Sequence, residues 1–308
     1  MNAVSPVTSG HFATLASGQT LHYAQAGDKS RPLAIFLHGF PQAWFAWEAQ
    51  LALSAQTHFC VAPDLRGFNL SDKPSDLKAY RIDRLVNDVV ELIDALGYKT
   101  AELIAHDWGG AVAWSVAIAR PDKLEHLMIL NAPHPIPFAK ALAHDAAQQA
   151  ASQYMLELRS SDAEQKMLAN DCDVLLNKFR AGDAHWLSDA VAQRYRDAWR
   201  QPGAMTGMLA YYRASPLMPP TDAASGAAGL KLNPADFMVT VPTTVIWGMQ
   251  DVALLPVLLD GLEELVPDLT LRTVDNASHW LVHERPDVVA AEIETFLGLS
   301  QLPSTADR

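Results

Sequence analysis

The sequence predicts an α/β fold in which a mostly parallel sheet is flanked by helices and is interrupted by an inserted helical cap. Short apolar runs bounded by turn residues alternate with longer segments of helical periodicity, an order typical of parallel sheets. From about residue 138 to residue 212 this alternation gives way to a wholly helical pattern, and it resumes at residue 243. We therefore expect a core of residues 1–135 and 239–308, with residues 136–238 forming the cap and its connector.

The expected strands are short and rich in apolar residues. In chain order they cover residues 22–27, 33–37, 59–62, 101–105 and 127–130 before the cap, and 243–247 and 269–274 after it. Ligands in open sheets of this kind bind at the carboxyl ends of the strands. Side chains that directly follow each run are therefore the candidates for chemistry, and we expect the cap to lie over them.

Two core helices are indicated by periodicity. Apolar residues recur at helical spacing from residue 82 to residue 96, where Gly97 ends the pattern, and the acidic residues Asp88, Glu91 and Asp94 predict a solvated face. Residues 286–297 form a second amphipathic pattern at the end of the chain, while residues 214–230, rich in Ala, Pro, Gly and Ser, indicate a connector.

Composition restricts the functional classes. With 308 residues, 49% of them hydrophobic, the chain can bury a large core, and its net charge of −12 disfavours nucleic acid and anionic membranes as partners. Cys60 and Cys172 form no metal or disulfide pattern, which favours a reducing compartment. Neither a signal-like start nor an apolar run of roughly 20 residues occurs, so we expect a cytoplasmic protein without a membrane span, and a homodimer stays open.

Asp107 is the principal candidate for a nucleophile. It stands in Ala-His-Asp-Trp-Gly-Gly, residues 105–110, where the spacing of small residues matches a strand-to-helix elbow that usually carries serine. A carboxylate that attacked an acyl group would form a reactive anhydride, whereas displacement at an alkyl carbon forms a stable ester. The residue type therefore predicts an alkyl-ester intermediate.

Asp251 and His279 complete the order nucleophile, acid, histidine, since each follows an expected strand end. The histidine would take a proton from water, and the carboxylate would hold its tautomer and stabilise the imidazolium. Other acids lie nearby at positions 260, 268 and 275, but placement at a strand end favours Asp251.

The backbone N–H groups of Phe40 and Trp108 are the expected oxyanion donors, because one follows an early strand and the other follows the nucleophile. Trp44, Trp280 and His106 are expected to line the substrate site. His106 and His134 have no cysteine or carboxylate cluster at metal spacing, so neither a metal nor another cofactor is expected. Asp64 and Arg66 are expected to pair with each other and fix a loop.

Five motifs together resemble the soluble epoxide hydrolase family over nearly the whole chain: residues 38–41 (His-Gly-Phe-Pro), 64–67 (Asp-Leu-Arg-Gly), 106–110, 131–135 (Asn-Ala-Pro-His-Pro) and 278–280 (Ser-His-Trp). The resemblance implies the α/β-hydrolase fold with a helical cap, cofactor-independent conversion of a small epoxide and water to a vicinal diol, and a role in detoxification or xenobiotic metabolism. It also implies two cap tyrosines that protonate the ring oxygen. Tyr154 matches the first and Tyr212, directly before Arg213, the second, with Tyr211 as the alternative.

The chain departs from the family pattern at two places. Residues 67–71 read Gly-Phe-Asn-Leu-Ser where the family usually has Gly-x-Gly-x-Ser, and because Asn69 tolerates a positive φ we expect the turn to be kept. Glu157 replaces part of an aromatic run after Tyr154, which leaves the substrate range open.

Two alternative functions use the same fold. Haloalkane dehalogenases also have Asp followed by Trp, but they need a second N–H donor that the Phe40 side chain lacks. Dehalogenases of haloacids such as fluoroacetate carry arginines where this chain has Trp108 and Ala111. A non-catalytic ligand receptor is the third interpretation, and the complete Asp107, Asp251 and His279 set argues against it.

Overall fold

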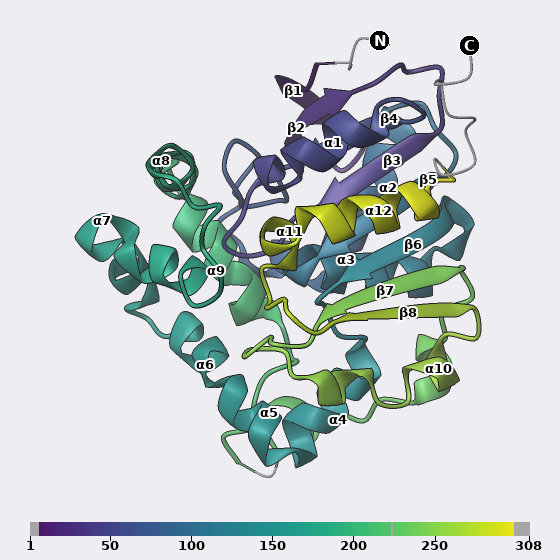
Figure 1. Ribbon diagram of the computed structural model, residues 1–308. Coiled ribbons are helices and arrows are strands. Elements are labelled where there is room, and N and C mark those ends of the chain that lie inside the picture. The colour runs from purple at the N-terminus through teal and green to yellow at the C-terminus, as the bar shows by residue number, and fades with distance from the viewer. Residues whose placement is uncertain (1–5, 223, 299–308) are drawn as a thin grey trace.

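An eight-stranded sheet forms the centre of the molecule in the computed structural model, which describes residues 6–222 and 224–298 (Figure 1). Residues 1–5, 223 and 299–308, which belong to the segments assigned above to the core and the connector, lie outside the described residues. The strand order is β1-β2-β4-β3-β5-β6-β7-β8. The strands are β1 (Thr8–Thr14), β2 (Thr20–Ala26), β3 (Leu33–Leu37), β4 (Phe59–Pro63), β5 (Ala101–His106), β6 (Leu124–Leu130), β7 (Thr243–Gly248) and β8 (Leu269–Val274).

The sheet confirms the predicted fold class. Strands β3 to β8 run parallel to one another, whereas β1 and β2 run antiparallel to their neighbours at one edge. All seven predicted strands are present within one to three residues of their expected ends. Strand β1 was not predicted, because its residues are mostly exposed and carry little of the apolar pattern that marks a buried strand.

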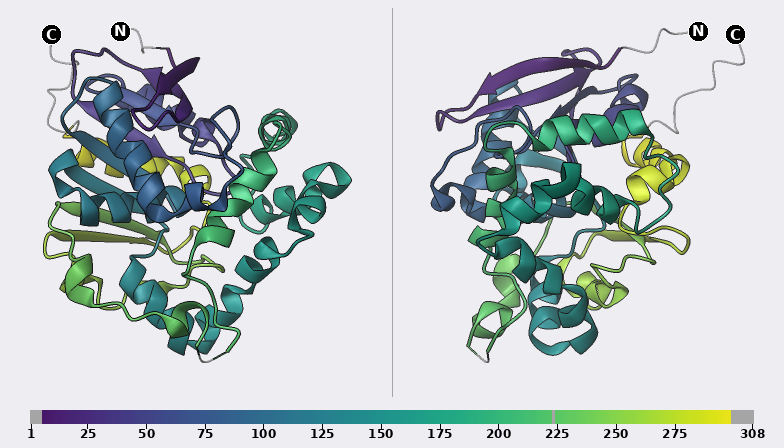
Figure 2. Two further views of the ribbon diagram at one scale, coloured as in Figure 1. Left: turned by 180° about the vertical axis from the view of Figure 1, so that it is seen from behind. Right: turned by 90° about the vertical axis from the view of Figure 1, so that its left-hand side faces the viewer.

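Helices cover both faces of the sheet. In Figure 1, α1 (Glu48–Ser54) and α12 (Pro286–Phe296) lie in front of it, and the view from behind in Figure 2 shows α2 (Ile82–Ala95) on the opposite face, where it packs on α3 (Asp107–Ala119). Side chains of successive residues in the central strands pack on opposite faces of the sheet. Leu103, for example, belongs to the hydrophobic cluster on one face and Ile104 to the cluster on the other. Two short helices, α10 (Leu262–Leu265) and α11 (Leu281–Glu284), complete the core.

The expectation of a solvated acidic face on α2 is wrong for Asp88. Its carboxylate is buried and accepts two hydrogen bonds from the guanidinium of Arg66, one of them 2.7 Å long. The expected pairing of Asp64 with Arg66 is also wrong, because Asp64 instead accepts hydrogen bonds from the backbone of Trp44 and the side chain of Asn69. Both acids still fix the 64–71 loop, each through a different partner.

The turn expected at Asn69, which stands where the family pattern has glycine, is present. Its φ is +38°, in the left-handed region that asparagine tolerates better than most residues. The preceding Gly67 has a φ of +85° and lies against Gly207 of the helical segment, where a Cβ on either glycine would meet backbone atoms at 3.0 Å or less. Close contact between loop and helix therefore depends on glycine on both sides.

Six α-helices lie between β6 and β7 among the described residues, in the segment that the sequence assigns to the cap, at the left and bottom of Figure 1. They are α4 (Pro135–His144), α5 (Ala146–Ala151), α6 (Gln153–Arg159), α7 (Ala163–Phe179, interrupted by non-helical residues 169–172), α8 (Asp189–Trp199) and α9 (Ala204–Ala214). The indole N–H of Trp199 donates to the carbonyl of Pro41 in the core. The exact division into core and cap stays a prediction.

Candidate active site

Asp107 lies at a sharp turn between β5 and α3. Its φ is +51°, an unusual value for a residue other than glycine, and its side chain is 11% exposed. Neighbouring backbone approaches the turn closely, because a Cβ on Gly109 would lie 2.5 Å from the carbonyl oxygen of Leu37 and one on Gly39 would lie 2.2 Å from Asp107 Oδ1. The predicted strand-to-helix elbow is therefore present, and small residues make it possible.

His279 connects two carboxylates. Its Nδ1 lies 2.7 Å from Asp251 Oδ2, and its Nε2 lies 3.5 Å from Asp107 Oδ2. Asp251 is held in turn by the backbone N–H groups of Ala253 and Leu254 and by the side-chain amide of Asn131, at 2.8 to 2.9 Å. The structure thus brings together the three residues that the chain order predicts.

Asn131 is a positioning residue for which the sequence analysis gave no role. Besides the hydrogen bond to Asp251, its Oδ1 accepts from the backbone N–H of Gly248 at 2.8 Å, and its own φ is +37°. It therefore joins the ends of β6 and β7. Its signals in the sequence are its place after a strand, as for the other site residues, and the 131–135 motif that it begins.

The charges of this group are coupled. Burial disfavours the imidazolium of His279, but the charge of Asp251 and the hydrogen bonds to both carboxylates outweigh it and raise the pKa of His279 to about 10. Burial would raise the pKa of Asp107, yet the hydrogen bond and charge of His279 lower it overall, and the same balance lowers the pKa of Asp251. At neutral pH the resting group is therefore an imidazolium between two carboxylates.

Two backbone N–H groups also hydrogen-bond the carboxylate of Asp107. The N–H of Phe40 donates to Oδ1 at 2.6 Å, and the N–H of Trp108 also hydrogen-bonds the carboxylate and lowers its pKa. Both residues named as oxyanion donors therefore face Asp107. Because Oδ1 is held there, Oδ2 is the freer oxygen for attack.

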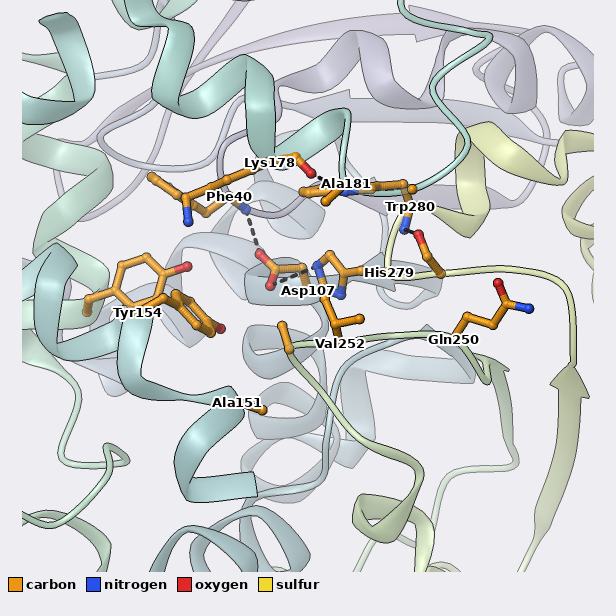
Figure 3. Close-up of a pocket in the computed structure, with 14 residues that line it drawn as sticks. Phe40, Asp107, Ala151, Tyr154, Lys178, Ala181, Gln250, Val252, His279 and Trp280 are labelled. Atoms are coloured by element: carbon orange, nitrogen blue, oxygen red, sulfur yellow. Dashed lines mark hydrogen bonds and ion pairs between the residues drawn. The ribbon is translucent and has the colours of Figure 1, made fainter. Parts of the chain in front are cut away.

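Tyr154 of α6 and Tyr212 of α9 face Asp107 from the helical segment, and Figure 3 shows Tyr154 pointing into the same cavity. Their rings lie 6.2 Å apart at nearly a right angle. Burial is the main cause that raises the pKa of both phenols, and the charge of Asp107 adds to it, after Tyr154 in the case of Tyr212. Both therefore keep their protons at neutral pH and can donate them in hydrogen bonds. The hydroxyl of Tyr211 instead donates to the carbonyl of Arg66 at 2.9 Å.

Two cavities meet at Asp107, Tyr154 and Tyr212. The smaller, of about 260 Å³, extends past His279 and Trp280, as drawn in Figure 3. The larger, of about 540 Å³, extends past Trp108 under α9, and both have mainly apolar walls. An extended ligand could therefore place its reacting centre at Asp107 and one substituent in each cavity.

Of the three residues expected to line the site, Trp280 does so, and Trp44 and His106 do not. Trp44 is instead buried in the core, where it packs edge-on against Phe45 beneath the guanidinium of Arg194. His106 is fully buried behind His279, and the Nε2 of His106 lies 2.8 Å from the backbone carbonyl oxygen of His279. Burial, together with the charge of His279, lowers the pKa of His106 to about 4, so it is neutral there.

Lys178 and Ser278 line the smaller cavity and were not predicted. Ser278 belongs to a buried contact in which Glu284 accepts hydrogen bonds from the backbone N–H and hydroxyl of Ser278, both 2.7 Å long, and from the backbone N–H of Asp183, at 3.0 Å. Glu284 therefore joins the His279 loop to the helical segment. Lys178 and Glu284 belong to no motif named above, and the meeting of these residues depends on how the helices pack.

Across the residues that the structure describes, no group of three or more His, Cys, Asp or Glu side chains is arranged to hold a metal ion. Nor is any helix in the described ranges long and apolar enough to cross a membrane.

Comparison with known proteins agrees with this geometry. Residues 32–286 match the family described as alpha/beta hydrolase fold, which places the chain in that superfamily. The chain is 39% identical to the AB hydrolase superfamily protein YfhM of Bacillus subtilis, over 91% of this chain and 95% of that protein, and 34% identical to Epoxide hydrolase 4 of Homo sapiens, over 91% and 76%. A crystal structure of Bacillus megaterium epoxide hydrolase in complex with an inhibitor superposes with a TM-score of 0.85 at 32% identity, covering 94% of this chain and 100% of that one. The chain therefore belongs to the epoxide hydrolase family of the α/β hydrolases.

Proposed function

We propose that this protein hydrolyses epoxides to vicinal diols through a covalent alkyl ester on Asp107. One observation carries the proposal: a carboxylate at the elbow lies against His279 on one side and opens on the other side into cavities lined by Tyr154 and Tyr212. A nucleophile, a base and two neutral proton donors around one cavity are the groups that ring opening followed by ester hydrolysis requires.

In the first step Oδ2 of Asp107 attacks a ring carbon and the bond from that carbon to the ring oxygen breaks. Tyr154 and Tyr212 donate hydrogen bonds to this oxygen, which becomes a hydroxyl by gaining one proton. General-acid assistance of this kind contributes about two to four decades of rate. The product of the step is a hydroxyalkyl ester of Asp107.

Ester formation removes the negative charge of Asp107 and with it one of the contributions that raise the pKa of His279. The ring oxygen takes its proton from a tyrosine hydroxyl, and the proton that His279 gives up replaces it. His279 thereby becomes a neutral base that stays hydrogen-bonded to Asp251. The first step therefore prepares the base for the second.

In the second step neutral His279 takes a proton from water, and the resulting hydroxide attacks Cγ of the ester. Negative charge develops on Oδ1, to which the N–H of Phe40 donates, while the N–H of Trp108 also hydrogen-bonds this carboxyl group. Each such donor contributes about two to three decades of rate. The bond between Cγ and the diol oxygen breaks, and the diol takes the proton from His279. The second proton of the water, left on the new Asp107 carboxyl group, then passes to His279, which restores the imidazolium and the carboxylate, now with one oxygen from water.

Single turnover in ¹⁸O-labelled water tests the proposal. With enzyme in excess over styrene oxide, we expect the label in Asp107 and unlabelled oxygen in the diol, read by mass spectrometry of the peptide and the product. Solvent oxygen in the first-turnover diol with unlabelled Asp107 would refute the covalent route.

The His279→Gln variant gives a second readout, because the ester should form and persist without its base. We expect an intact-mass increase equal to one epoxide, and no increase in Asp107→Asn treated in the same way. An unmodified His279→Gln protein after prolonged exposure to epoxide would count against the mechanism.

We further propose a cytoplasmic location, which the free, buried state of Cys60 and Cys172 supports because reduced thiols fit a reducing compartment. Homodimer formation stays an open prediction, which light scattering of the purified chain would test.

A further inference from the structure

Lys178, in the last turn of α7, gives the smaller cavity a cationic side chain that the proposed reaction does not use. Apart from His279, it is the only basic side chain in the described lining of that cavity. In Figure 3 it lies above Phe40 and Tyr154, on the helical side of the cavity. Its Nζ is 5.4 Å from the centre of the Tyr154 ring.

The position of Lys178 is fixed by its backbone and its neighbour. Its carbonyl accepts a hydrogen bond from the indole N–H of Trp280 at 2.9 Å. The next residue, Phe179, is fully buried among the aromatic rings of Trp186, Tyr195 and Trp280. Packing of its neighbours therefore fixes the backbone of Lys178, and with it the side of α7 from which the lysine enters the cavity.

Among the described residues, no carboxylate oxygen lies within 4.0 Å of the Lys178 ammonium nitrogen, so this group has no ion-pair partner there. Burial lowers its pKa, and Glu157 opposes this only through a longer-range charge effect. Lys166 on the same helix differs, since it is exposed and lies 2.9 Å from Asp162. A half-buried cation beside a cavity is stabilised when a bound anion enters.

We propose that the smaller cavity binds the carboxylate of an epoxy acid, with Lys178 as its cationic partner. This inference rests on the proposed function. The ring then lies at Asp107, and an apolar chain extends into the larger cavity along residues such as Phe138, Leu217 and Leu254. The volumes of about 260 and 540 Å³ suit a short polar arm and a longer apolar arm.

The test compares trans-β,γ-epoxynonanoate with its primary amide, which has nearly the same shape without the charge. The value of kcat/KM is measured for both substrates with the full-length protein and with the variants Lys178→Met, Lys178→Arg and the matched control Lys166→Met. Because any effect of Lys178 on the acidity of Tyr154 acts on both substrates, the acid-to-amide ratio isolates recognition of the carboxylate.

We expect Lys178→Met to lower this ratio by about 10- to 100-fold, the range of a hydrogen bond to a charged group. Lys178→Arg should restore most of the ratio, and Lys166→Met should leave it at the wild-type value. An equal ratio in the wild type and in Lys178→Met would overturn the inference.

Calorimetric binding of nonanoate separates this inference from the proposed function. We expect the Kd to rise about 10- to 100-fold in Lys178→Met and to stay unchanged in Lys166→Met. If no epoxide were hydrolysed while nonanoate still bound through Lys178, only the proposed function would fail. If Lys178→Met bound nonanoate as tightly as the wild type, the carboxylate site would be wrong whatever the turnover.

Discussion

Asp107→Asn imitates the loss of charge that ester formation causes, because the carboxamide has nearly the same shape as the carboxylate and is neutral. His279 Nε2 lies 3.5 Å from Asp107 Oδ2. Coulomb's law at an effective dielectric constant of about 20 gives about 5 kcal/mol for unit charges at this separation, or about 3.5 pKa units. The pKa of His279, raised to about 10 in the resting protein, should therefore fall to about 6.5 in the variant.

The assay is an NMR titration of protein labelled with ¹³C and ¹⁵N in histidine, with the His279 signal assigned by its loss in His279→Gln. Asp260→Asn is the matched control, since it removes one exposed carboxylate from the chain and should leave the pKa of His279 where it is. A pKa in Asp107→Asn within about half a unit of the wild-type value would refute the reasoning that ring opening creates the base.

Tyr212→Phe should lower the single-turnover rate of ring opening by about two to four decades. Tyr211→Phe should have little effect on that rate and should lower the free energy of unfolding by about 1 kcal/mol, because its hydroxyl donates only to the carbonyl of Arg66. Asp88→Asn leaves the Arg66 guanidinium buried without its counter-charge, so urea titration should show a loss of about 3–5 kcal/mol of stability, and a loss below about 1 kcal/mol would contradict the buried pair. Gly39→Ala would bring a Cβ within 2.2 Å of the nucleophilic carboxylate, so a folded variant, judged by its thermal transition, should have no measurable epoxide turnover.

Local sequence signals were sufficient for the elbow, the strand ends and the order of Asp107, Asp251 and His279. Each of these depends on residues adjacent in the chain, such as small residues beside a turn or a polar residue that ends an apolar run. The cap tyrosines came from family resemblance, because helical periodicity does not say which face of a cap helix meets the core.

Side-chain partners that depend on packing could not be predicted. Periodicity placed Asp88 on the polar side of α2, and only the fold shows that Arg66 reaches it there. Lys178 looked like an ordinary helix residue until the packing of α7 against Trp280 placed it beside the cavity. The prediction that Trp44 lines the site was wrong for the converse reason, since a tryptophan after a strand end can equally pack against its own loop.

Because the two cavities that meet at Asp107 differ in size, the site can distinguish the two ring carbons of a symmetrical epoxide. In a cis epoxide with two identical substituents, the ring carbons are mirror images of each other and react equally in water. Between a smaller and a larger cavity they are no longer equivalent, because each orientation presents a different carbon to the carboxylate. Attack inverts only the carbon presented, so an achiral epoxide would leave this protein as a diol enriched in one enantiomer.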